Sequence, residues 1–101
     1  MIVAFSVAPT TATDDDGGVA DAVAEAVRIV RESGLPNETN AMFTLIEGEW
    51  DDVFDVVKRA TEAVSTVSPR TSLVIKADIR PGFTGQLTAK VDAVNRRLAS
   101  S

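Results

Sequence analysis

The most informative stretch of the chain is Met42-Phe43-Thr44-Leu45-Ile46-Glu47-Gly48-Glu49-Trp50. Its apolar residues alternate up to a carboxylate and a glycine, and this period of two predicts a half-buried strand over 42–47. The apolar period then becomes helical over 49–67, so a strand passes directly into a helix at Glu47-Gly48. The junction brings together a carboxylate, free backbone N–H groups and the only tryptophan. It fits either a tight turn beside a core tryptophan or a small-ligand site.

The composition narrows the possible functions. A chain of 101 residues predicts one domain, 1–101, and a start that reads as a strand rather than a signal peptide predicts a cytoplasmic location. The absence of Cys, His and Tyr removes the commonest metal ligands and the commonest general base, so we expect no metal, no cofactor and a binding protein rather than an enzyme. A net charge of −5 argues against a nucleic-acid partner, and no apolar run is long enough to cross a membrane.

Periodicity along the rest of the chain predicts the other elements. Strands are expected over 2–8, 36–40 and 71–80, with a turn near Asn40-Ala41. Helices are expected from Val19 to a stop at Ser33-Gly34, and again after Pro81-Gly82. The acids at 14–16 are expected to cap the first helix rather than to bind a metal. The order strand, helix, strand, strand, helix, strand, helix predicts an α+β, ferredoxin-like sandwich with a four-stranded antiparallel sheet and an added C-terminal helix.

One face of this sheet should remain uncovered by the first two helices. We expect it to carry small residues of the first strand beside charged residues of the last strand, with these two strands as central neighbours. Apolar side chains are expected there too, namely Ile2, Met42, Ile46 and Val74. A second subunit covering this face would explain the mixture, so we expect a homo-oligomer. The charges at Lys76, Asp78 and Arg80 suit either a ligand site or ion pairs between strands.

Three segments resemble a known family, the small ferredoxin-like thiamine-binding proteins. They are the opening strand with Ser6 and Pro9, the run from Met42 to Asp51, and Ile75-Lys76-Ala77-Asp78-Ile79-Arg80. The resemblance covers the whole chain. It implies homotetramers that bind thiamine (vitamin B1) or its hydroxymethylpyrimidine moiety through strand residues near subunit interfaces, without established catalysis.

Carried over by matching position, the resemblance makes Ser6, Thr44, Glu47, Lys76, Asp78 and Arg80 the candidate ligand-binding residues. Trp50 joins them as a cation–π surface for the thiazolium, with simple packing as its alternative. Thr44 has an even number and Glu47 an odd one, and side chains alternate along a strand, so the two lie on opposite faces of an ideal strand.

Glu47 is the expected partner of the pyrimidine. Because two cations and two carboxylates balance, we expect a neutral or cationic ligand rather than a phosphorylated one. The alternative function is a ferredoxin-like regulatory or assembly module without a ligand.

Overall fold

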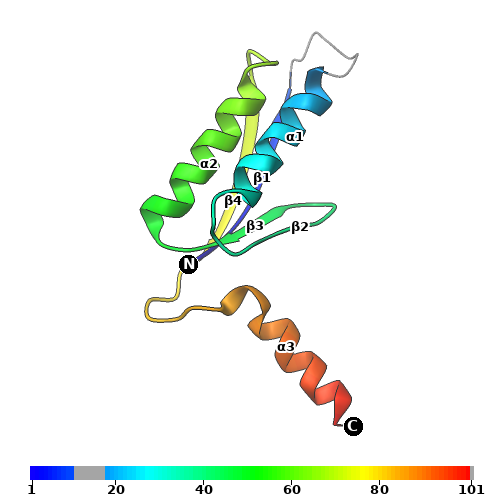
Figure 1. Ribbon diagram of the computed structural model, residues 1–101, viewed down its shortest axis with the longest axis vertical. Coiled ribbons are helices and arrows are strands. Elements are labelled where there is room, and N and C mark those ends of the chain that lie inside the picture. Colours follow the sequence, from blue (N-terminus) through cyan, green and yellow to red (C-terminus); the bar gives the residue numbers. More distant parts are fainter. Residues whose placement is uncertain (11–17, 101) are drawn as a thin grey trace.

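The architecture of the computed structural model, which describes residues 1–10 and 18–100, is a two-layer α+β sandwich of the ferredoxin-like type (Figure 1). The predicted element order and fold class are confirmed. The predicted capping by the acids at 14–16 falls outside the described residues. The elements are β1 (Ile2–Pro9), α1 (Gly18–Arg31), β2 (Asn37–Thr39), β3 (Thr44–Glu47), α2 (Trp50–Ser65), β4 (Thr71–Asp78) and α3 (Gln86–Ala99).

The four strands form one antiparallel sheet in the order β2-β3-β1-β4. The first and last strands are neighbours, as expected, but the prediction that both are central is wrong. Strands β1 and β3 occupy the centre, and β4 is an edge strand of eight residues. Alternation cannot distinguish an edge strand from a central one, because both present one face to the helices.

The hydrophobic core lies between the sheet and the helices α1 and α2, which run side by side over one sheet face (Figure 1). Ile46 is 0 % exposed and belongs to this core, so its predicted place on the uncovered face is wrong. Ile46 pairs directly with the buried Val3, and residues that are paired across antiparallel strands share a face. Met42, also expected on the uncovered face, precedes β3 in a loop and is 74 % exposed.

The predicted hairpin turn near Asn40 is confirmed, and it forms without an Asn-Gly pair. The Asn40 side-chain Oδ1 accepts hydrogen bonds from the backbone N–H groups of Met42 and Phe43, both at 2.8 Å. An asparagine side chain can replace a backbone carbonyl in this way. The turn loop therefore extends beyond Asn40-Ala41, and β3 begins only at Thr44.

Helix α3 lies apart from the two-layer body and is reached through residues 79–85 (Figure 1). None of its residues is buried. This placement gives a Cα radius of gyration of 15.6 Å, whereas a compact chain of this length has about 13 Å. Gly82 and Gly85 in the connection adopt positive φ values of 82° and 67°. Within the described residues, no helix combines the length and the apolar character needed to cross a membrane.

Candidate functional site

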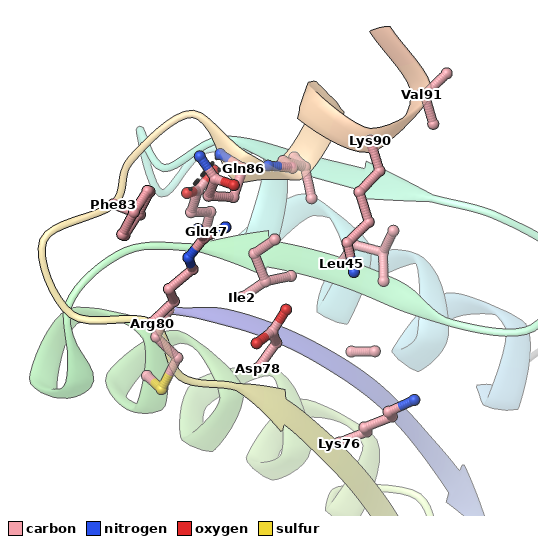
Figure 2. Close-up of a pocket in the computed structure, with 13 residues that line it drawn as sticks. Ile2, Leu45, Glu47, Lys76, Asp78, Arg80, Phe83, Gln86, Lys90 and Val91 are labelled. Carbon is pink, nitrogen blue, oxygen red and sulfur yellow. Dashed lines mark hydrogen bonds between the residues drawn. The ribbon is translucent and has the colours of Figure 1, made fainter. Parts of the chain in front are cut away.

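A hollow of about 570 Å³, which we call the open-face pocket, lies between the uncovered sheet face and the first turns of α3 (Figure 2). This volume falls within the range of small-molecule sites. Its lining comes from β1, β3, β4, the connection to α3 and α3 itself. The lining residues are Met1, Ile2, Ala4, Leu45, Glu47, Lys76, Asp78, Arg80, Phe83, Gln86, Leu87, Lys90 and Val91.

Strand register sets the floor of the open-face pocket. Ile2 pairs with Glu47 on one side and with Asp78 on the other. In the next row, Ala4 pairs with Leu45 and with Lys76. Because paired residues share a face, both rows point away from the core. The short side chain of Ala4 leaves space between its two longer neighbours, and this space deepens the pocket.

Glu47 ties the sheet to α3. Its side chain is almost buried, with 6 % of the residue exposed. One carboxylate oxygen accepts the backbone N–H of Gln86 at 3.0 Å, and the other accepts that of Leu87 at 3.1 Å. The first N–H groups of a helix lack intrahelical partners and carry its positive dipole end, so a carboxylate stabilises them.

The anchoring role of Glu47 was not predicted. A signal for it in the sequence is Gly85, the residue before α3, which has no side chain to cap the helix. Free N–H groups at such a start need an acceptor from elsewhere. The acceptor comes from a strand that lies 39 residues earlier, and local sequence patterns do not reveal such a distant pairing.

The open-face pocket carries more positive charge than the sequence predicted. Lys76, Asp78 and Arg80 line it together with Glu47, and the structure adds Lys90 from α3. Ion pairs in the described part of the chain lie elsewhere, on the surfaces of α1 and α2: Arg28–Glu25, Arg28–Glu32, Lys58–Glu62 and Arg59–Asp55.

The Arg80 guanidinium lies over the Phe83 ring instead of pairing with Asp78, and its central carbon is 3.6 Å from the ring centroid. An arginine over an aromatic face makes a favourable cation–π contact. This contact orders the connection that leads from β4 to α3. The pairing of Lys76, Asp78 and Arg80 with one another, considered as an alternative to a ligand site, is not among the ion pairs of the described residues.

The remaining candidate residues lie outside the open-face pocket. Thr44 pairs with Phe5 and therefore faces the helices, on the opposite side from Glu47 as parity predicted. Together with Ser6 it lines a second hollow of about 180 Å³, between α1 and the β2–β3 hairpin. Of the seven candidates, the structure brings four together in the open-face pocket: Glu47, Lys76, Asp78 and Arg80.

Trp50 is neither a core residue nor a neighbour of Glu47 in the open-face pocket. It is 53 % exposed at the start of α2 and lines a separate notch of about 210 Å³. Its ring stacks on Phe54 with the centroids 5.4 Å apart. Residues four apart on a helix are surface neighbours, so this contact stabilises the first turn of α2.

The donor set in the pocket suits an organic ligand. No cluster of three or more His, Cys, Asp or Glu residues that could hold a metal ion occurs within 1–10 and 18–100. Two carboxylates accept hydrogen bonds, three cations donate them, and Leu45, Phe83, Leu87 and Val91 supply apolar surface.

Comparisons with known proteins identify relatives of this chain. A UPF0045 protein of Mycobacterium bovis is 54 % identical over 99 residues, covering 97 % of this chain and 94 % of that protein. A solved domain of unknown function (DUF77) from Bacillus cereus superposes with a TM-score of 0.76 at 36 % identity, over 89 % of this chain and 85 % of that one. Residues 3–95 match the family described as Thiamine-binding protein. The chain therefore belongs to the thiamine-binding protein family.

Proposed function

We propose that this protein binds thiamine or a related hydroxymethylpyrimidine compound in the open-face pocket, without catalysis, for salvage, sequestration or sensing. The observation that carries the proposal is the convergence of Glu47, Lys76, Asp78 and Arg80 in one hollow of a thiamine-binding family member. The hollow is mostly apolar between these polar groups, as expected of a small-molecule site.

The chemistry of the ligand matches this lining. An aminopyrimidine carries an exocyclic amine that donates hydrogen bonds and a ring nitrogen that can accept one. Each oxygen of Glu47 receives one backbone N–H and retains capacity for a further hydrogen bond. The thiazolium is a permanent cation, and the exposed carboxylate of Asp78 is the complementary charge in the same row of the sheet.

Filling the floor of the pocket tests the proposal. Ala4→Leu should weaken thiamine binding by about tenfold or more, because a larger side chain between Leu45 and Lys76 occupies the ligand's space at a cost of about 1–3 kcal/mol. Ala8→Leu is the matched control, since Ala8 lies on the same face of β1 but outside the pocket. Isothermal titration calorimetry measures the thiamine affinity of both variants. Equal thiamine affinities in both variants would exclude this pocket.

A second candidate function, assembly, is supported by unpartnered surface on the single chain. The apolar side chains of Val91 and Val94 on α3 are 60 % and 54 % exposed. Among the described strands, β4 has a neighbour on one side only, and Val74 on this strand is 53 % exposed. Exposed apolar patches and long open edges mark surfaces that other chains cover. We propose that other copies of this chain cover the apolar surface of α3 and the edge of β4. The chains then form a homo-oligomer, which the family resemblance implies is a tetramer.

Native mass spectrometry tests assembly and ligand binding together. We expect the protein to appear as a dimer or tetramer, and Val94→Asp to shift it to the single-chain mass because a charge on the apolar stripe opposes burial. Asn95→Asp is the matched control, since it adds the same charge at the next exposed position. A single-chain mass for the unaltered protein would overturn the oligomer. An oligomer that binds no thiamine would favour the assembly module over the binding protein.

A further inference from the structure

The positive charge around the open-face pocket is concentrated against the trend of the whole chain. The protein has 10 basic and 15 acidic residues, for a net charge of −5. Among the pocket residues the balance is reversed, with three cations, Lys76, Arg80 and Lys90, facing two carboxylates, Glu47 and Asp78. A local excess of positive charge in an acidic protein attracts anions to that place.

One of the two carboxylates is already balanced. Both oxygens of Glu47 accept N–H groups at the positive end of α3. Arg80 is engaged with the Phe83 ring, while Lys76 and Lys90 take part in none of the ion pairs of the described residues. The pocket charges without an ion-pair partner among the described residues are thus the two ammonium groups, the Arg80 guanidinium over the neutral Phe83 ring, and the Asp78 carboxylate. This differs from the even balance inferred from the sequence, which omitted Lys90.

Lys90 lies on the side of α3 that faces the pocket. Residues three apart on a helix share a face, and Leu87 and Lys90 both line the open-face pocket. In Figure 2 the Lys90 side chain extends from α3 to the neighbourhood of Leu45, while Lys76 extends from β4. Leu45 and Lys76 flank Ala4 in one row of the sheet. The two lysines therefore approach Ala4 from opposite sides, Lys76 from β4 and Lys90 from the side of Leu45.

We propose that Lys76 and Lys90 form an anion subsite over Ala4, which takes the phosphate or pyrophosphate group of a phosphorylated ligand. The inference rests on the proposed function and names its ligand class: a thiamine phosphate ester rather than free thiamine alone. The row of Ala4 lies two residues along the strands from the row of Glu47, about 7 Å. One end of an elongated ligand can thus reach Glu47 while its phosphate reaches the lysines, which bind phosphate as point charges.

Calorimetry with thiamine, thiamine diphosphate and pyrophosphate, without added divalent cation, tests the subsite. The unaltered protein should bind thiamine diphosphate about tenfold or more tightly than thiamine, the scale of one charge-assisted contact. The double variant Lys76→Gln/Lys90→Gln should lose this preference for the diphosphate and should lose pyrophosphate binding. Lys58→Gln is the control, because Lys58 is an exposed lysine of α2 outside the pocket.

The three ligands separate the two proposals. Thiamine binding with no preference for the diphosphate, or a preference that survives in the double variant, overturns the subsite and leaves the proposed function standing. Lysine-dependent binding of pyrophosphate without thiamine binding supports the subsite and overturns the proposed function. Binding of none of the three overturns both.

Discussion

Glu47→Gln should release α3 from the sheet. The backbone N–H groups of Gln86 and Leu87 both donate to this carboxylate, whereas a glutamine offers one acceptor oxygen and turns its amide NH2, a donor, toward the other N–H. Loss of a hydrogen bond to a charged group costs about 1.5–3 kcal/mol, so exchange of these two amides should accelerate by about 10- to 100-fold. Hydrogen exchange followed by mass spectrometry measures the exchange rates of these amides.

Thiamine affinity should fall in the same variant, because Glu47 both contacts the pocket and positions its α3 wall. Glu49→Gln is the matched control. Glu49 is exposed at the start of α2 and makes no side-chain capping hydrogen bond there, so neither exchange in α3 nor thiamine binding should change. Unchanged protection of Gln86 and Leu87 in Glu47→Gln would show that other contacts hold α3.

Ile46→Ala should lower the free energy of unfolding by about 2–5 kcal/mol, since Ile46 is 0 % exposed and truncation leaves a cavity among Val3, Val53 and their neighbours. Leu45→Ala, one residue earlier, should cost far less stability but should weaken thiamine binding, because Leu45 faces the open-face pocket. Urea unfolding and calorimetry on both variants measure the two effects. Equal losses of stability would contradict the face assignment of β3.

The fold was largely predictable because its signals are local. Alternation and helical periods predicted all seven elements, and the hairpin turn was expected near Asn40-Ala41, where the structure shows the Asn40 side chain accepting backbone N–H groups. What local patterns could not supply was strand order and the face assigned to Ile46. Both depend on pairing with β1, which is a contact between segments far apart in the chain.

The candidate site could be predicted only in part, because it too depends on contacts between segments far apart in the chain. Glu47 and Asp78 both pair with Ile2, so strand register brings together residues that the family motifs single out. Parity had already separated Thr44 from Glu47. Lys90 had no such signal, because its place over the pocket depends on how α3 is anchored, and that anchor joins segments about 40 residues apart.

The anchoring of α3 also implies an order of events during synthesis. Every member of the core cluster lies between Val3 and Val64, and the sheet is complete at Asp78. All the helices and strands of the two-layer sandwich are therefore synthesised before α3, which starts at Gln86. Domains form from the N-terminal side as they emerge. The nascent chain can thus fold its sandwich, with the Glu47 carboxylate in place, before α3 is synthesised and its N-terminus binds that carboxylate.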